Sequence, residues 1–293
     1  MSKTFSAPQV VCRPALARDH ADVAEFCKGL WEGGDYVPDV WPHWFNDPHG
    51  ILVTAEYNGQ AIGCGKLSLI DEAQWWLEGF RVDPNHQGLK VGSRIHNYLT
   101  DWWVEHGNGI LRLMTENPAV VHLCEKTDYV KTHELRGYRV NPIDETTENF
   151  SHATDTREAA AFALASESLQ LTNTLIDFGW RIGTPNEHIF EIYSGNKADF
   201  VHTFYWWKDR QGLFSAWEDE EDDKRTLVLG VLASALNDMS ALLMDIRRLA
   251  AHKKFDKVFL LAFLKPQLLA QLEQAGFSTS WENYLRLFER KKP

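Results

Sequence analysis

The chain has 293 residues, of which 44% are hydrophobic and 12% aromatic, which is enough apolar material for two buried cores. Its net charge of -11 and pI near 5.5 argue against a nucleic-acid or anionic-membrane partner, because such surfaces need clustered Lys and Arg. Four cysteines without any C-x-x-C spacing indicate a reducing, cytoplasmic setting. The longest apolar run, Val258 to Leu264, is far short of the roughly 20 residues that cross a bilayer, so we expect a soluble protein.

The first half alternates strand and helix signals. A strand at 10–13 precedes a helical stripe that starts at Asp19. Asn58-Gly59 joins two extended runs, 51–57 and 61–70, and predicts a β-hairpin. A strand at 74–82 comes next, and apolar residues then recur at helical spacing up to residue 106. After a strand at 110–115, Asn117-Pro118 opens another helix, and two strands between 129 and 140 end a mixed α/β domain.

The second half repeats part of this order. A clear helix stripe runs from Leu236 to Leu249, and a strand at 258–264, a helix at 266–274 and a last strand at 281–289 follow it. Helix, strand, helix and strand is also the order of residues 92–140, which indicates a divergent internal duplication. We therefore predict two domains, residues 1–148 and residues 149–293.

The segment from Val82 to Ser93 carries the clearest chemical signal. Its strand ends in Val82-Asp83-Pro84 and passes through a turn with Gly88 into a helix containing Gly92. The first N–H groups of a helix have no internal partner, and the helix dipole adds partial positive charge there. Such a turn predicts a pyrophosphate site, in which glycine permits close approach.

This segment resembles the GNAT superfamily of N-acetyltransferases, whose motif is Gln/Arg-x-x-Gly-x-Gly/Ala after a strand that ends in valine, one residue and proline. Gln87, Gly88 and Gly92 match the motif, whereas Lys90 stands where the family has glycine. We expect Lys90 to keep a negative φ. The resemblance implies a mixed, mostly antiparallel sheet flanked by helices, and acetyl-coenzyme A as co-substrate without a metal. It assigns coenzyme binding to Phe80, Val82, Gln87, Gly88, Leu89, Lys90, Val91, Gly92, Ser93 and Asn117.

A second family motif, Asn-x-x-Ala-x-x-x-Tyr-x-Lys-x-Gly-Phe, is similar to the segment that begins at Asn117. Cys124 stands where many family members carry a tyrosine that protonates the departing coenzyme A thiolate. The sequence leaves two interpretations open, a proton donor or a small buried apolar residue. Water, Tyr98 or Tyr129 are alternative donors.

Amine acetylation needs a base that removes a proton from the nucleophile. Glu78 is the predicted base, because it lies four residues before Val82 on the strand that, in the family, separates from its neighbour. A period of two places Glu78, Phe80 and Val82 on one face of that strand. A surface or salt-bridged glutamate is the alternative.

The acceptor pocket is predicted around residues 35–44, with Asp35, Tyr36 and Trp41 as substrate-binding residues suited to a cationic or aromatic amine. This run is similar to the corresponding segment of the histidine N-acetyltransferase-like group. A Trp-rich loop that packs on the core is the alternative. No metal-binding spacing is present among the histidines and cysteines.

The sequence thus predicts an N-acetyltransferase that acts on a primary amine of a small molecule, with an amino acid α-amine as the narrowest expectation. The alternatives are a polyamine or aminoglycoside acetyltransferase and a non-catalytic acyl-coenzyme A sensor. The second half lacks the glycine pair and a Gln or Arg before its helix, so we expect a degenerate GNAT-like domain that does not bind coenzyme A. A monomer or a homodimer is expected.

Overall fold

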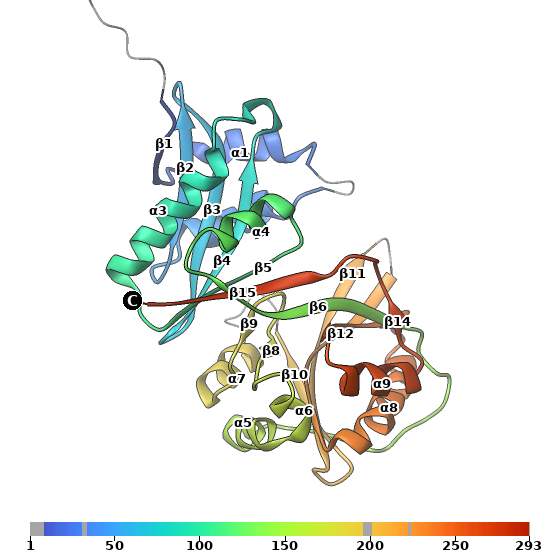
Figure 1. Ribbon diagram of the computed structural model, residues 1–293. Helices are drawn as coiled ribbons and strands as arrows, with labels where there is room; N and C mark the ends of the chain where they lie inside the picture. Colours follow the sequence, from blue (N-terminus) through green and yellow to red (C-terminus); the bar gives the residue numbers. More distant parts are fainter. Residues whose placement is uncertain (1–8, 31–33, 196–200, 222–223, 293) are drawn as a thin grey trace, which may run out of the picture. The chain divides into compact units, whose positions relative to one another are not determined.

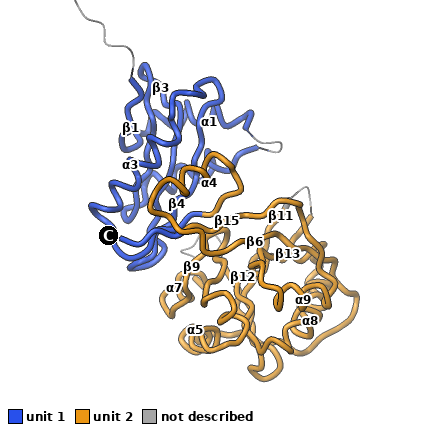
Figure 2. Tube along the Cα trace, in the orientation of Figure 1, with its two compact units in different colours: residues 1–113, 289–293 blue, residues 114–288 orange. Residues whose placement is uncertain are grey.

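A computed structural model describes residues 9–30, 34–195, 201–221 and 224–292. The chain forms two compact units, residues 1–113 with 289–293 and residues 114–288 (Figure 2). Within the described ranges, no helix is both long and apolar enough to cross a membrane.

The first unit is built on a sheet in the order β1-β2-β3-β4-β5, and residues 289–291 of the C-terminal strand lie beside β5 (Figure 1). All pairs are antiparallel except β4 with β5. The elements are β1 (Val11–Pro14), α1 (Asp19–Cys27), α2 (Val37–Phe45), β2 (Ile51–Tyr57), β3 (Gln60–Asp71), β4 (Gln74–Val82), the 3-10 turn η1 (Pro84–His86), α3 (Val91–His106) and β5 (Ile110–Thr115), whose last two residues fall in the second unit.

The predicted hairpin at Asn58-Gly59 is confirmed. Asn58 and Gly59 have φ angles of 52° and 85°, the left-handed pair that a two-residue turn requires to match the twist of β2 and β3. Asn and Gly are the residues that adopt this conformation at least cost, so two residues determine the register of the hairpin.

The two faces of this sheet are covered by different helices. A Cβ atom on Gly63 or Gly65 would come within 3.1 Å of Ile95, so these glycines allow α3 to approach one face closely. The opposite face packs on α1 and α2. Its cluster contains Val23, Cys27, Val37, Trp41, Trp44, Leu52, Ala61 and Cys64.

The buried carboxylate of Asp19 in α1 forms hydrogen bonds to residues of β1 and β2. Asp19 is 1% exposed and accepts hydrogen bonds from Arg13 at 2.7 and 2.9 Å, from the Thr54 hydroxyl at 2.9 Å and from the Leu16 N–H at 2.8 Å. Burial opposes its ionisation, but these hydrogen bonds together hold the pKa of Asp19 below its usual range. Glu56 accepts from the same guanidinium at 3.0 Å.

The second unit has the sheet order β15-β6-β13-β12-β11-β10-β7. From β6 to β7 the neighbouring strands are antiparallel except for β12 with β13. Its elements are α4 (Pro118–Glu125), β6 (Val130–Val140), β7 (Phe150–His152), α5 (Thr156–Ala165), α6 (Glu167–Gln170), β8 (Ile176–Asp177), β9 (Ile182–Gly183), α7 (Glu187–Ser194), β10 (Thr203–Trp207), β11 (Gly212–Glu221), β12 (Lys224–Ser234), the 3-10 turn η2 (Leu236–Asp238), α8 (Met239–His252), β13 (Lys257–Phe263), α9 (Pro266–Gln274), β14 (Ser278–Thr279) and β15 (Leu285–Lys291).

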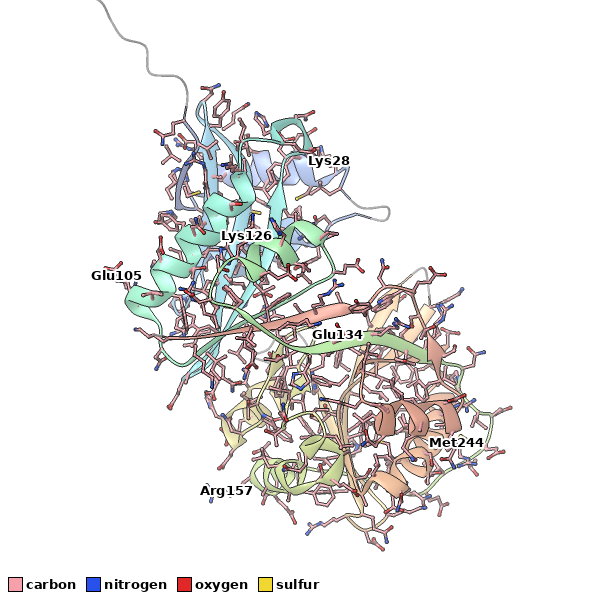
Figure 3. The ribbon with its side chains drawn as sticks, in the orientation of Figure 1. Lys28, Glu105, Lys126, Glu134, Arg157 and Met244 are labelled. Atoms are coloured by element: carbon pink, nitrogen blue, oxygen red, sulfur yellow. The ribbon has the colours of Figure 1, made fainter. Side chains whose placement is uncertain are left out.

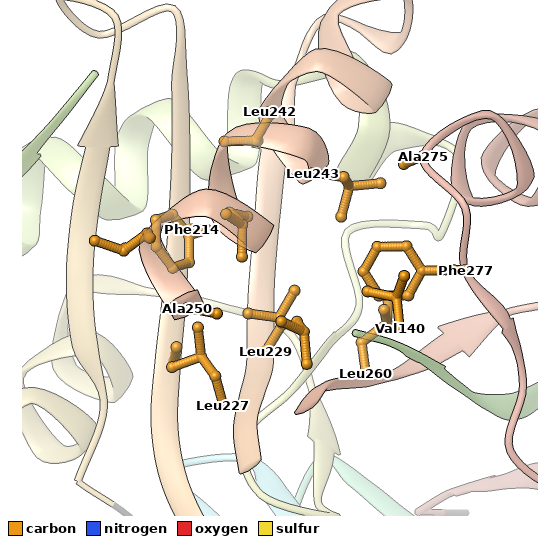
Figure 4. Close-up of a cluster of buried hydrophobic side chains, with 14 of the residues drawn as sticks. Val140, Phe214, Leu227, Leu229, Leu242, Leu243, Ala250, Leu260, Ala275 and Phe277 are labelled. Atoms are coloured by element: carbon orange, nitrogen blue, oxygen red, sulfur yellow. The ribbon is translucent and has the colours of Figure 1, made fainter. Parts of the chain in front are cut away.

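The core of this unit lies between α8, α9 and the sheet (Figure 4). Leu242, Leu243 and Ile246 are fully buried along one stripe of α8, as the predicted helix pattern requires. Asp245 on the same helix accepts from the Trp207 indole N–H at 2.8 Å and from the Asn149 amide at 2.7 Å, which anchors α8 to β10.

The order β10-β11-β12-α8-β13-α9 reproduces β2-β3-β4-α3-β5-α4, as the duplication predicts. One detail was wrong. The two strands expected between 129 and 140 are one strand, β6, which runs over residues 130–140 because this segment contains no turn-forming pair that would break it. β6 pairs with β13 of the second unit from Leu135 to Val140, and the domain boundary at residue 148 stays a prediction.

Asp19→Asn removes one charge from a buried, hydrogen-bonded pair. We expect the free energy of unfolding to fall by roughly 2–3 kcal/mol near neutral pH. Folding lowers the pKa of Asp19. The stability difference between the wild type and the variant is therefore largest above the pKa of an unfolded aspartate, about 3.9, and it becomes smaller as the pH falls through the pKa of Asp19 in the folded protein. Urea denaturation across pH 2–7 measures this difference. The exposed Asp101→Asn is the control, and a pH-independent difference would contradict the ionised pair.

Candidate functional site

β4 separates from β5 soon after it begins. The two strands pair in parallel only at Gln74 with Ile110, Trp75 with Leu111 and Trp76 with Arg112. Beyond Trp76, β4 continues to pair with β3 as far as Val82. Among the described residues, no strand pairs with its other edge over residues 77–82. In this stretch the Gly79 carbonyl accepts from the Cys64 thiol at 3.5 Å and the Phe80 carbonyl accepts from the Arg81 guanidinium at 3.0 Å. A strand edge without a neighbouring strand is suited to an extended ligand.

Arg112 holds the paired base of the two strands. Its side chain is 3% exposed and donates to Gln74 at 2.8 Å and to Glu289 at 2.7 Å. Both partners lie in the first unit, and Glu289 belongs to the C-terminal strand. The hydrogen bond to Gln74 links β5 to β4 beside their paired residues, and the two strands separate after Trp76.

A β-bulge interrupts β4 inside the unpaired stretch. Cys64 faces Arg81 and Lys66 faces Glu78, so Gly79 and Phe80 together oppose Gly65. Gly79 has φ +66°, and a Cβ atom there would lie 2.4 Å from Cζ3 of Trp44. Only glycine satisfies both requirements, so the bulge depends on this residue.

The bulge overturns the expected alternation of β4. Glu78 accepts a hydrogen bond from Ser68, which shares its face of β3 with Cys64 in the cluster on α1 and α2. Phe80 reaches the other face, where its Cε2 atom lies beside Gly65, Ile95 and Leu99. Glu78 and Phe80 therefore lie on opposite faces, because the extra residue shifts the period of two.

Glu78 belongs to a group of polar side chains on the face of the sheet that packs on α1 and α2. The Ser68 hydroxyl donates to its Oε1 atom at 2.6 Å, and Lys66 is its direct neighbour across the strands. Lys66 is completely buried and donates to Asp47 and to the Leu67 carbonyl. Burial opposes ionisation of Asp47, but Lys66 holds the pKa of that carboxyl below its usual range. Glu78 is half-buried, with one oxygen held by Ser68.

The turn that follows β4 leaves the start of α3 open. Asp83 accepts from the Asn85 N–H at 2.9 Å and contacts His86 Nδ1 at 2.8 Å, which fixes η1. Gly88 then has φ +84°, and α3 begins at Val91. The N-cap residue offers no side-chain acceptor, and the first bond of the helix runs from the Arg94 N–H to the Lys90 carbonyl at 3.0 Å.

The amides of Val91, Gly92 and Ser93 therefore have no carbonyl to bond within α3. A Cβ atom on Gly92 would meet nothing nearer than Val82 Cγ2 at 3.9 Å, so the helix start is sterically open. Residues 87–90 are exposed. Open amides, a helix dipole and the cation of Lys90 together fit an anionic group such as a pyrophosphate.

Lys90 does not have the expected negative φ. Its φ of +58° and ψ of 31° are left-handed, because the chain must reverse from the extended Gln87 into the first turn of α3 within a few residues. For a residue with a side chain this conformation costs about 1 kcal/mol. The glycine of the family motif at this position avoids that cost.

The three predicted acceptor residues lie in different environments. The Asp35 side chain is completely buried, paired with Arg81 and hydrogen-bonded to the Val37 N–H at 3.0 Å. Trp41 is 2% exposed and stacks on His20 with ring centroids 5.8 Å apart. Tyr36 is 50% exposed, with the guanidinium of Arg81 5.4 Å from its ring centre. Of the three, Tyr36 presents its side chain to solvent.

Asn117 and Cys124 lie in the second unit. Asn117 caps α4 as predicted, because its side chain accepts from the Ala119 N–H at 2.9 Å. Cys124 is completely buried near the end of this helix, which Lys126 follows in Figure 3. Burial raises the pKa of the Cys124 thiol to about 12, so the thiol is protonated at neutral pH.

The first half of the chain matches a known family. Residues 18–129 match the model of the acetyltransferase (GNAT) family. A human protein named probable N-acetyltransferase 16 is 26% identical over 145 residues, which cover 47% of this chain and 37% of that protein. Histidine N-acetyltransferase of Xenopus tropicalis is 24% identical over 127 residues, 43% of this chain and 36% of the relative. The chain thus spans little more than a third of these relatives.

Solved structures are similar over almost the whole chain. A GCN5-related N-acetyltransferase from Sphaerobacter thermophilus has a TM-score of 0.62 at 14% identity and covers 97% of this chain and 96% of its own. A tandem GNAT protein from the clavulanic acid biosynthesis pathway has a TM-score of 0.63 at 10% identity, with coverage of 97% and 99%. At these identities the likeness shows the fold, which is a tandem GNAT fold.

Two substitutions separate the strain at Lys90 from its charge. We expect Lys90→Gly to raise the free energy of unfolding by up to about 1 kcal/mol, because glycine adopts φ +58° without the Cβ penalty. Lys90→Ala removes the same charge but keeps the Cβ atom, and we expect it to stay within about 0.5 kcal/mol of the wild type. Urea denaturation of the three proteins measures both values. Equal stability of the two variants would contradict the strained turn.

Proposed function

We propose that this chain is an acyltransferase that moves an acetyl group from acetyl-coenzyme A to a primary amine of a small molecule. The observation that carries the proposal is the edge of β4 beyond Trp76, which has no neighbouring strand among the described residues and leads directly into the uncapped start of α3. The strand edge suits the amide-bearing arm of the coenzyme, and the start of α3 suits its pyrophosphate.

Coenzyme binding is assigned to two sets of groups. Main-chain groups of Phe80 and Val82 bind the pantetheine amides, and the turn from Gln87 to Ser93 binds the pyrophosphate, with Lys90 as the added cation. Bound acetyl-coenzyme A supplies a thioester carbonyl as the electrophile.

Glu78 is the proposed base. Its Oε1 atom accepts from the Ser68 hydroxyl at 2.6 Å, and this contact orients a carboxyl group that is suited to take a proton from the amine. Lys66, the neighbour across the strand, carries a positive charge in the same polar group. Ser68 therefore orients the Glu78 carboxyl group on the strand beside Lys66.

Cys124 is the weaker of the two assigned catalytic residues. Its pKa of about 12 keeps the thiol protonated, as a proton donor requires, but makes it a poorer acid than an ordinary thiol at about 8.5. Proton transfer from Cys124 to a thiolate is therefore uphill. The decisive tests rest on the coenzyme turn and on Glu78.

The acceptor proposed is the α-amine of an amino acid. Support comes from the relatives named histidine N-acetyltransferase and from Tyr36, whose exposed ring lies beside the Asp35–Arg81 pair. An aromatic face next to paired charges suits a zwitterion with an aromatic or cationic side chain. Asp35 and Trp41 support this surface from within the unit.

Gly92→Asp tests the coenzyme site. The new carboxylate would lie at the open amides of α3 and repel a pyrophosphate, so we expect the Kd for coenzyme A to rise by about 30-fold or more, roughly 2 kcal/mol. Isothermal titration measures this Kd. Gly29→Asp adds the same charge at a position where a Cβ atom meets nothing within 4 Å, and it should bind as the wild type does. Equal binding by the two variants would place the coenzyme elsewhere.

Glu78→Gln tests the chemistry. We expect kcat to fall by roughly 10²–10³ while the Kd for coenzyme A stays within about twofold, because a general base acts in the transition state. A free-thiol assay with amino acids, polyamines and aminoglycosides identifies the acceptor and gives the rates. Glu72→Gln, an exposed residue at the tip of the same hairpin, is the control. Coenzyme binding without turnover on any amine would favour an acyl-coenzyme A sensor.

A further inference from the structure

The second unit contains the same opening between parallel strands. β12 and β13 pair only from Thr226 with Lys257 to Leu229 with Leu260. β12 continues to Ser234, still paired with β11 on its other side, and η2 then leads into α8. The edge of β12 over residues 230–234 therefore corresponds to the open edge of β4.

This edge is already hydrogen-bonded by the chain itself. Ser168 of α6 is 2% exposed, and its hydroxyl donates to the Leu232 carbonyl at 3.0 Å and accepts from the Ser234 N–H at 3.1 Å. One side chain thus satisfies a main-chain acceptor and a main-chain donor of β12. A coenzyme arm would need the same two groups.

The start of the following helix is closed in the same way. A carboxylate oxygen of Glu167 accepts from the Leu236 N–H at 2.8 Å, where η2 begins. The side-chain oxygen of Gln271 on α9 accepts from the Ser240 N–H at 3.3 Å, in the first turn of α8. Asp238, the N-cap residue of α8, adds a further negative charge. An anionic pyrophosphate would meet acceptors and carboxylates at this turn.

The space that remains between the strands is small. A cavity of about 60 Å³ is lined mostly by apolar side chains, including those of Leu169, Leu232, Met239 and Leu260. This volume has room for only a few water molecules. The residues of this opening therefore do not fit a coenzyme.

We propose that α6 acts as an internal ligand of the second unit, with Glu167 and Ser168 in place of the coenzyme's pyrophosphate and amide groups. Where β12 and β13 separate, Ser168 satisfies the Leu232 carbonyl and the Ser234 N–H. The chain consequently binds one coenzyme A, in the first unit. The coenzyme measurement rests on the proposed function, whereas the exchange measurement below does not.

Amide hydrogen exchange tests the internal ligand directly. In Ser168→Ala the Ser234 N–H loses its acceptor, and we expect it to exchange about tenfold faster than in the wild type. Ser194→Ala removes a serine hydroxyl from an exposed helix position and should leave the Ser234 rate unchanged.

Glu167 is exposed, so Glu167→Ala is expected to fold, and the Leu236 N–H should exchange faster in that variant. Unchanged rates at Ser234 and Leu236 would overturn the inference.

Equilibrium dialysis with coenzyme A gives the second measurement. We expect one bound molecule per wild-type chain and at least a 30-fold loss of affinity in Gly92→Asp, with no second site. Two molecules per wild-type chain, or one molecule retained at wild-type affinity by Gly92→Asp, would overturn the closed slot. No binding to the wild type at all would contradict the proposed function alone, and the exchange rates would still decide the role of α6.

Discussion

The candidate site of the first unit depends on one constraint: after Trp76, β4 pairs with β3 on one side and no longer pairs with β5 on the other. A strand edge with unpaired main-chain groups is costly when it is buried and useful when a ligand can reach it. Arg112 fixes where the opening begins, through Gln74 and Glu289. Gly79 then bends β4 against Trp44, and Asp83 with η1 directs the chain into α3.

The bulge at Gly79 determines which side chains of β4 reach the face that packs on α3 and which reach the face that packs on α1 and α2. Without the extra residue, Glu78 and Phe80 would point the same way, and the strand could not place an apolar ring against α3 and a carboxylate against α2. With it, Phe80 packs beside Ile95 and Leu99, whereas Glu78 joins Lys66 and Ser68. The cost is a conformation that only glycine adopts easily, and Trp44 fills the space that a side chain would need.

Local signals in the sequence were enough for the elements and for the turn. Asn58-Gly59 determines its hairpin, Asn117-Pro118 caps α4, and Val82 to Gly92 marks the strand-to-helix passage, because each of these depends on neighbouring residues alone. The contacts around the site could not be read in this way. Asp35 meets Arg81 across 46 positions, and Lys66 is placed opposite Glu78 only by a register that includes a bulge. A glycine inside a strand pattern was the one signal that could have indicated the bulge.

The two units show two ways to satisfy the same main-chain groups. Strands that separate in a parallel pair leave donors and acceptors that need partners, and the partner can be a ligand or a segment of the chain. In the first unit the edge of β4 has no neighbouring strand after Trp76 among the described residues, the first amides of α3 have no partner within that helix, and Lys90 lies at the turn in a strained conformation. In the second unit Ser168 and Glu167 of α6 occupy the corresponding positions. Their partners lie far along the chain, with sequence separations of 64 for Ser168 with Leu232 and 69 for Glu167 with Leu236. A duplicated fold can therefore keep its strand geometry while losing its ligand, provided that a neighbouring side chain supplies the missing hydrogen bonds.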